Sequence, residues 1–168
     1  MKFAFAILLV ALCCAANFAQ ETNAEKDFEK NKLRYKLETF SEGEDASSGY
    51  DYLVYKNKGK IVKIREIWSS SAETTYRVED YYFKDGKLIL FAEYTFAKRF
   101  YKTAVKGTNI TLTLVEKLSF TDSKLSNWLE KGKSVTNDDK RWQDKEMEVL
   151  EKTSDQLENY KLLKAERN

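Results

Sequence analysis

The side chains that could do chemistry in this sequence are mainly carboxylates. Glu79-Asp80, Glu93 and Glu116 lie in segments rich in aromatic and branched residues, where neighbouring strands can bring two carboxylates together. A retaining glycosidase needs two such groups about 5 Å apart, one of them with a raised pKa. Glu79 and Glu93 are the pair that adjacent hairpin strands would supply. Strand carboxylates that balance nearby Lys and Arg are far commoner, so we expect no catalytic residue.

Residue types that are missing from the chain narrow its chemistry further. There is no His, and the two Cys residues, Cys13 and Cys14, both lie in the first twenty residues. The usual general base, the Ser-His and Cys-His pairs and nearly all catalytic zinc sites are therefore excluded. Gly-rich phosphate loops and calcium loops are also missing from the sequence. We expect a protein that is not an enzyme and that uses no metal or other cofactor.

The first twenty residues predict a secretory signal peptide. Lys2 precedes an apolar run from Phe3 to Ala16 that is too short to span a bilayer comfortably, and small residues follow up to Ala19. We place the mature start near Gln20 or Glu21, which gives a signal peptide at 1–20 and a single domain at 21–168. The expected location is secreted or periplasmic. The mature chain would contain no Cys, so its core alone must stabilise it.

The charge of the mature chain is close to zero. Loss of Lys2 with the signal peptide reduces 29 basic residues to 28, against 27 acidic ones, a net charge of about +1. Such a chain has no net field to attract nucleic acid or an anionic membrane. We expect no nucleic-acid partner and no stable membrane insertion after cleavage.

A β-hairpin is predicted over 78–91. Two aromatic and aliphatic runs flank Lys84-Asp85-Gly86-Lys87, and Asp-Gly tolerates the positive φ angles of a tight turn. Similar turns occur around Gly59 and Ser123, and an aromatic residue precedes each turn (Tyr55, Phe83 and Phe120). The sequence therefore predicts three hairpins in an antiparallel meander over 50–129. Its six strands are expected at 50–56, 60–68, 75–84, 87–96, 109–120 and 124–129.

Helices are predicted at both ends of this meander. Phe28 and Tyr35, seven residues apart, suit a short N-terminal helix over 24–40, although 33–37 also alternates like a strand. At the other end, Asn137-Asp138-Asp139 can cap a helix over 137–165. Its apolar stripe would comprise Trp142, Met147, Leu150, Leu157 and either Leu163 or Lys164. A helix of that length should cover one face of the sheet, which makes the fold class α+β.

The segment Tyr82-Phe83-Lys84-Asp85-Gly86-Lys87-Leu88 resembles hairpins that are repeated in uncharacterised bacterial secreted proteins. Those hairpins carry an aromatic-x-Asp/Asn-Gly-Lys-Leu pattern, and the resemblance extends over 50–129. The third hairpin departs from the pattern, because Asp122-Ser123 replaces Asp-Gly. The resemblance implies a β-rich envelope or secreted protein and assigns no catalytic or binding residue.

Aromatic residues of the second hairpin are the candidates for ligand binding, namely Tyr81, Tyr82, Phe83 and Tyr94. An aromatic sheet face could hold an apolar small molecule or stack on a sugar ring or peptide. Cross-strand aromatic pairing would explain the same residues without a ligand. Because Tyr81 and Phe83 share one face and Tyr82 lies on the other, we expect one set to be half exposed.

The function predicted from the sequence is a non-catalytic binding or interaction domain with an unknown protein partner. A carrier of an apolar small molecule is the main alternative, and a carboxylate-based hydrolase is the third. The triplet Asn109-Ile110-Thr111 matches the N-glycosylation acceptor, which matters only if the chain passes through an endoplasmic reticulum.

Overall fold

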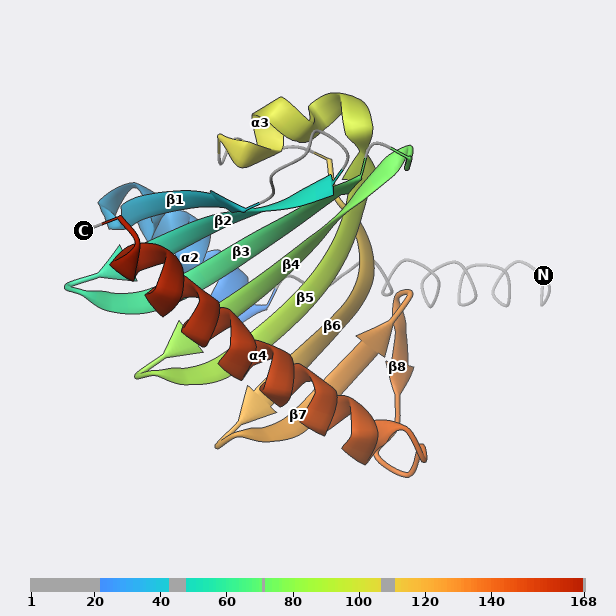
Figure 1. Cartoon of the computed structure of the whole chain (residues 1–168). Helices are drawn as coiled ribbons and strands as arrows, with labels where there is room; N and C mark the ends of the chain where they lie inside the picture. Colours follow the sequence, from blue (N-terminus) through green and yellow to red (C-terminus); the bar gives the residue numbers. More distant parts are fainter. Residues whose placement is uncertain (1–21, 43–47, 71, 107–110, 168) are drawn as a thin grey trace, which may run out of the picture.

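The computed structural model describes residues 22–42, 48–70, 72–106 and 111–167. The predicted signal peptide lies outside these residues, and so does Asn109 of the glycosylation triplet. Within the described ranges, eight strands form one antiparallel sheet in the order of the chain (Figure 1). They are β1 (Lys36–Glu42), β2 (Ser48–Asn57), β3 (Lys60–Ser70), β4 (Thr75–Lys84), β5 (Lys87–Ala97), β6 (Thr113–Thr121), β7 (Lys124–Glu130) and β8 (Lys133–Val135).

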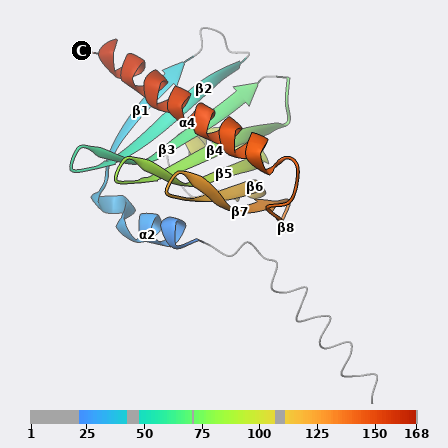
Figure 2. The same ribbon diagram turned by 90° about the horizontal axis from the view of Figure 1, so that it is seen from below.

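Helices cover both faces of this sheet. The long helix α4 (Trp142–Ala165) crosses one face, and α2 (Asn23–Asn31) lies on the opposite face (Figure 2). The 3₁₀ helix η1 (Lys32–Arg34) follows α2, while the 3₁₀ helix η2 (Lys98–Phe100) and α3 (Tyr101–Val105) form the β5–β6 connection. The predicted α+β class, antiparallel sheet and C-terminal helix are confirmed.

The hairpin turns have the backbone that the sequence predicts. Asp85 and Gly86 have φ angles of 51° and 80°, and Lys58 and Gly59 have 48° and 84°. Positive φ at both central residues matches the right-handed twist of the flanking strands. The third turn is built the same way although Ser123, with φ 63°, replaces Gly.

Each of these three hairpins also contains a bulge at the same place. Tyr82 pairs with Leu90 but Phe83 pairs with Leu88, so that Ile89 is the extra residue of β5. By the same registers, Val62 is the extra residue of β3 and Ser126 that of β7. The residue equivalent to Phe83 in the first hairpin is consequently Lys56, so Tyr55, the aromatic residue that precedes that turn, lies one position earlier than Phe83 does.

The prediction of about six strands was wrong at the first edge of the sheet. The expected helix over 24–40 ends at Asn31, and β1 follows it and pairs with β2. Leu33, inside the range expected to be helical, is fully exposed, and only Phe40 of β1 is buried. An edge strand with a single buried residue carries little hydrophobic pattern, which is why the helical spacing gave a false match.

The second missed strand, β8, has three residues and closes a fourth hairpin with β7. Its turn at Lys131 and Gly132 again has positive φ at both residues. The C-terminal helix begins at Trp142 and not at Asn137, because the residues before it form turns. In these turns the Asp139 carboxylate accepts a hydrogen bond from the backbone amide of Arg141. Met147 lies outside the apolar stripe of α4, since 61% of it is exposed.

The sheet separates two apolar cores. The core under α4 includes Tyr81, Phe83, Phe91 and Trp128 of the strands with Val149 of the helix. The core on the α2 side contains Phe28 of that helix, Ala104 of α3 and, from the strands, Leu53, Tyr55, Ile67, Tyr76, Val78, Tyr82, Leu90 and Phe96. Alternate residues of each central strand thus face different helices.

Candidate ligand-binding site

The four aromatic candidates from the sequence fall on opposite faces of the sheet. Tyr81 and Phe83 belong to the core under α4, whereas Tyr82 and Tyr94 pack on the α2 side. Tyr81, Tyr82 and Phe83 are buried and Tyr94 is half-buried. The expectation of one half-exposed aromatic face was therefore wrong, because helices cover both sides.

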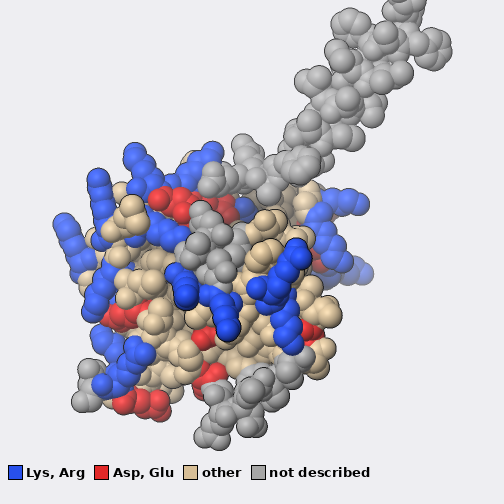
Figure 3. All heavy atoms as spheres, turned by 90° about the horizontal axis from the view of Figure 1, so that it is seen from above, with Lys and Arg blue, Asp and Glu red and all other residues tan. Residues whose placement is uncertain are grey.

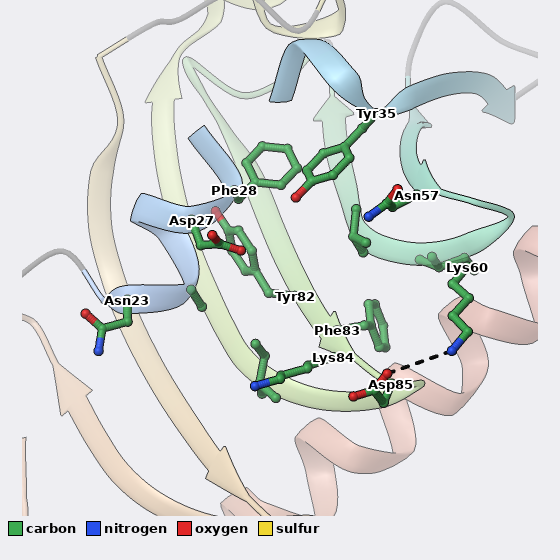
Figure 4. A pocket seen from close by; sticks show the side chains of 14 residues that line it. Asn23, Asp27, Phe28, Tyr35, Asn57, Lys60, Tyr82, Phe83, Lys84 and Asp85 are labelled. Atoms are coloured by element: carbon green, nitrogen blue, oxygen red, sulfur yellow. Dashed lines mark ion pairs between the residues drawn. The ribbon is translucent and has the colours of Figure 1, made fainter. Parts of the chain in front are cut away.

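A cavity of about 470 Å³ lies between α2 and the ends of the first two hairpins (Figure 4). It takes residues from α2, the segment after η1, and the strands β2 to β5. Two sequence candidates, Tyr82 and Phe83, line it. We call this space the α2 cavity. Its complete lining is Asn23, Ala24, Asp27, Phe28, Tyr35, Asn57, Lys60, Ile61, Val62, Tyr82, Phe83, Lys84, Asp85 and Ile89.

Aromatic rings form one wall of the α2 cavity. The ring centroid of Phe28 lies 5.6 Å from that of Tyr35 and 5.7 Å from that of Tyr82, the second pair edge to face. Figure 4 shows the rings of Phe28 and Tyr35 side by side next to α2, with Tyr82 close to them. Such pairs stabilise each other beyond simple burial, which favours a wall that is ordered before a ligand binds.

The hairpin bulges supply the aliphatic part of the lining. Val62 and Ile89 are the extra residues of β3 and β5, and both line the cavity. A bulge twists its strand locally and redirects a side chain. The repeated hairpin geometry thus places two equivalent aliphatic side chains in one space.

The rim of the cavity is polar and balanced in charge. Asp27 and Asp85 provide negative charge there, and Lys60 and Lys84 provide positive charge. Lys60 Nζ lies 3.8 Å from Asp85 Oδ1 between the two hairpin tips, the pair marked in Figure 4. Both side chains are more than three-quarters exposed, so this ion pair contributes little stability.

A buried ion cluster lies beside the α2 cavity. Arg65 donates from Nε and Nη2 to both oxygens of Asp80, and Lys63 Nζ donates to Asp80 at 2.8 Å and to Tyr82 at 2.9 Å. The Lys63 ammonium also lies 4.6 Å from the centre of the Phe28 ring. The cluster and Tyr82 line a second space of about 190 Å³.

The pKa values of the ion cluster reflect its burial. Burial and the neighbouring Arg65 lower the pKa of Lys63 to about 8. Burial alone would raise the pKa of Asp80, but Arg65 and Lys63 outweigh it and hold that pKa at about 2. The two cations therefore keep Asp80 ionised over the physiological range.

A second network anchors α2 to the sheet. Glu25 accepts hydrogen bonds from the Thr22 amide and hydroxyl, as in a capping box, and from Tyr94 and Lys117. Burial raises the pKa of Glu25, but Lys117 and Thr22 outweigh that effect, so the pKa is lowered overall. Tyr94, a candidate ligand contact from the sequence, thus positions the helix over the cavity.

The carboxylates considered for hydrolysis lie elsewhere. Glu79 and Glu93 are direct cross-strand partners, as the sequence suggested, but they face α4. Glu79 accepts a hydrogen bond from Tyr81 and pairs with Arg77 and Lys152. Neither of the two cavities is lined by Glu79 or Glu93.

Lysine and arginine side chains are spread over the end of the molecule that carries α3, with acidic side chains among them (Figure 3). In the described part of the chain, no group of three or more acidic, His or Cys side chains is arranged to hold a metal ion. None of the helices within the described ranges combines the length and apolar character needed to cross a bilayer.

Comparison of the chain with models of protein families, with curated proteins and with solved structures gave no match. Function therefore has to be inferred from the residues of the cavities and their surroundings. Phe28 and Tyr35 in the α2 cavity were visible in the sequence as a seven-residue spacing. Lys63 and Arg65 are charged residues within an otherwise apolar strand segment. Their position is a sequence signal for the buried ion cluster, which was not predicted from the sequence.

Proposed function

We propose that this chain is an exported, non-catalytic binding protein that carries a small, largely apolar molecule in the α2 cavity. The observation that supports this most is the space of about 470 Å³ walled by Phe28, Tyr35 and Tyr82. Cavities of about 300 to 1,000 Å³ with an apolar lining and a few polar groups are typical of small-molecule sites. Export rests on the predicted signal peptide.

The lining indicates the chemistry of the ligand. Rings and the aliphatic side chains of Val62 and Ile89 favour a molecule with a planar or branched hydrocarbon part. The rim offers both signs of charge and the amides of Asn23 and Asn57, so no net charge on the ligand is required. A neutral, ring-bearing molecule with a polar group at one end fits these features best.

The anchoring of α2 supports binding without a large rearrangement. Glu25 links the start of the helix to Lys117 at 2.8 Å and to Tyr94 at 2.8 Å. A wall held in position loses little conformational freedom when a ligand binds, which favours affinity.

A cavity-filling variant tests the proposal. Ala24 lines the α2 cavity from within α2, and Ala24→Leu adds an aliphatic side chain at a position where Leu is a good helix former. The neutral fluorescent probe N-phenyl-1-naphthylamine should bind the natural chain at one saturable site. We expect Ala24→Leu to weaken that binding about tenfold or more while thermal unfolding stays within a few degrees of the natural chain.

The matched control is the same substitution away from the cavity. Ala165→Leu changes the exposed last residue of α4 and should leave probe binding unchanged. Equal probe binding by Ala24→Leu and the natural chain would contradict the proposal, as would an equal loss in both variants.

A protein-binding module is the second candidate, favoured by the exposed apolar residues beside β1. Leu33 is fully exposed and Leu37 is 40% exposed, and β1 is an edge strand of the sheet. An extended segment of a partner could pair with that edge and cover both leucines. Native mass spectrometry of the exported protein separates the two candidates, because a carrier retains a small mass and a module retains a protein.

A further inference from the structure

Five glutamates form a continuous row across the sheet face that α4 covers. Cross-strand pairing joins Glu66 to Glu79, Glu79 to Glu93, Glu93 to Glu116 and Glu116 to Glu130. Like charges directly opposite each other destabilise a sheet. Glu66, Glu79 and Glu116 are also buried, so their repulsion is poorly screened.

Basic side chains neutralise only part of this row. Four ion pairs join three of its members to cations: Lys145 with Glu116 (2.6 Å), Lys152 and Arg77 with Glu79 (3.5 Å each) and Arg141 with Glu130 (3.2 Å). Within the described residues, Glu66 and Glu93 have no ion-pair partner. Glu66 is the more deeply buried of the two.

The contact that Glu66 makes with α4 leaves one atom unsatisfied. Gln156 donates from Nε2 to Glu66 Oε2, but Gln156 Oε1 is buried and has no hydrogen-bond donor. An ionised carboxylate can only accept hydrogen bonds, so it cannot fill that position. A protonated carboxyl group supplies one O–H donor, which Gln156 Oε1 can accept.

We propose that Glu66 is a proton-binding site. In its protonated form Glu66 makes a carboxylic acid–carboxamide pair with Gln156. The bound proton thereby stabilises the packing of α4 on the sheet. The proton satisfies the amide oxygen and removes one charge from the glutamate row at the same time. When the proton leaves, Glu66 repels Glu79 and the pair loses one hydrogen bond, so the middle of α4 is held less tightly.

The surroundings of Glu66 favour the neutral form. Burial, followed by the charge of Glu79, raises the pKa of Glu66 to about 7, while Arg77 and Lys152 act in the opposite direction. Glu42 of β1 adds to the rise. On β2, the phenol of Tyr52 lies across from Glu66, and burial followed by the charge of Glu66 raises the pKa of that tyrosine.

The direction of the pH effect follows from this raised pKa. Below an ordinary value of about 4.5, Glu66 is protonated in both folded and unfolded chains, and its stabilising contribution is complete. As the pH rises from about 4.5 to 7, the unfolded chain releases the proton while the folded chain keeps it, so stability is lost. The chain has no His to titrate in that pH range, but Glu93 of the same row also has a raised pKa, through burial and the charges of Glu79 and Glu116.

Carbon-13 NMR of the natural chain with labelled glutamate Cδ atoms tests the proposal directly. The signal that disappears in Glu66→Gln identifies Glu66, and we expect it to titrate near pH 7 in the folded protein. Titration of that signal near pH 4.5, with the other glutamates, would overturn the proposal.

Stability measurements on two variants give an independent test. Glu66→Gln keeps one donor and one acceptor for Gln156 without a charge, so it should match the natural chain at pH 5. From pH 5 to pH 8, the unfolding constant of the natural chain should rise roughly fiftyfold more than that of Glu66→Gln. Glu73→Gln, at an exposed site between β3 and β4 that does not contribute to the pKa shift of Glu66, is the control and should keep the pH dependence of the natural chain. An unaltered pH dependence in Glu66→Gln would refute the proposal.

Discussion

On the α2 face of the sheet two buried carboxylates, Asp80 and Glu25, lie against cations, whereas on the α4 face glutamates lie beside one another in a row. Asp80 lies between Lys63 and Arg65, and Glu25 accepts from Lys117. Across the sheet, Glu66 and Glu93 have glutamates as cross-strand neighbours. The same strands thus carry one face on which buried carboxylates pair with cations and another whose glutamate row, by our proposal, depends on a proton and on α4.

The two faces also differ in the space they leave open. The α2 face retains a cavity of about 470 Å³ under a short helix that the Glu25 network anchors. The α4 face is closed by a helix of 24 residues, with Val149 and Tyr160 packed into the core. The proposed ligand site therefore lies on the α2 face, and we assign a mainly stabilising role to the α4 face.

Removal of α4 should have the largest effect of the changes considered, because it uncovers the α4 face and leaves the α2 face covered. A chain that lacks residues 137–168 would expose the core that contains Tyr81, Phe83 and Trp128. A large exposed apolar face promotes association, so we expect aggregation in size-exclusion chromatography with light scattering. A chain that lacks only 166–168 is the control and should elute like the natural chain. If the long truncation is monomeric with unchanged melting, α4 is an appendage and the assignment fails.

The next largest effect is expected from the ion cluster on the α2 face. Asp80→Ala leaves Lys63 and Arg65 buried without their common partner, which should lower the free energy of unfolding by about 3–5 kcal/mol. Urea denaturation measures this change. Asp85→Ala breaks only the exposed pair with Lys60 and should change the free energy by less than about 1 kcal/mol. Equal effects of the two variants would show that the buried cluster contributes no more than a surface pair.

The pH dependence of stability should distinguish Asp80 on the α2 face from Glu66 on the α4 face. The pKa of Asp80 is about 2, below its ordinary value of 3.8, so its contribution is present above pH 3.8 and is lost as the pH falls toward 2. The raised pKa of Glu66 predicts a loss in the opposite direction, between pH 4.5 and 7. Denaturant midpoints measured from pH 2.5 to 8 should therefore fall toward both ends of that range. The fall toward pH 2.5 is the acid limb, and the fall toward pH 8 is the neutral limb.

Variants assign those limbs to the two faces. Asp80→Asn should reduce the acid limb, to which Glu38 with its pKa of about 2 also contributes, and should leave the neutral limb in place. Glu66→Gln should reduce the neutral limb and leave the acid limb in place. A single variant that removed both limbs would contradict the assignment of separate faces.

Local turn chemistry explains how much of the fold the sequence predicted. Asp85-Gly86 specifies its turn with two adjacent residues, and flanking strands with strong β propensity confirm it. The segment Lys131-Gly132-Lys133 has the same residues as the first turn, Lys58-Gly59-Lys60, and forms the turn of the fourth hairpin. The sequence did not predict this hairpin, because β8 has only three residues and therefore little strand pattern. The first edge strand was missed because its alternation places a single residue, Phe40, in the core.

The candidate site was less predictable, since it depends on long-range placement. Tyr82 was named from the sequence and lines the α2 cavity. The position of α2 above it depends on a contact between Glu25 and Lys117, which are 92 residues apart. The lining also depends on bulges that direct Val62 and Ile89, and nothing in the local composition specifies a bulge.

The most direct test of the assignment is methyl NMR of the natural chain during titration with N-phenyl-1-naphthylamine. Val62 and Ile89 report on the α2 cavity, and Ile64 and Leu118 report on the core under α4. We predict saturable shifts of the Val62 and Ile89 methyl signals, with Ile64 and Leu118 unchanged. Shifts confined to Ile64 and Leu118, or no saturable shift at Val62 and Ile89, would contradict the assignment of ligand binding to the α2 face.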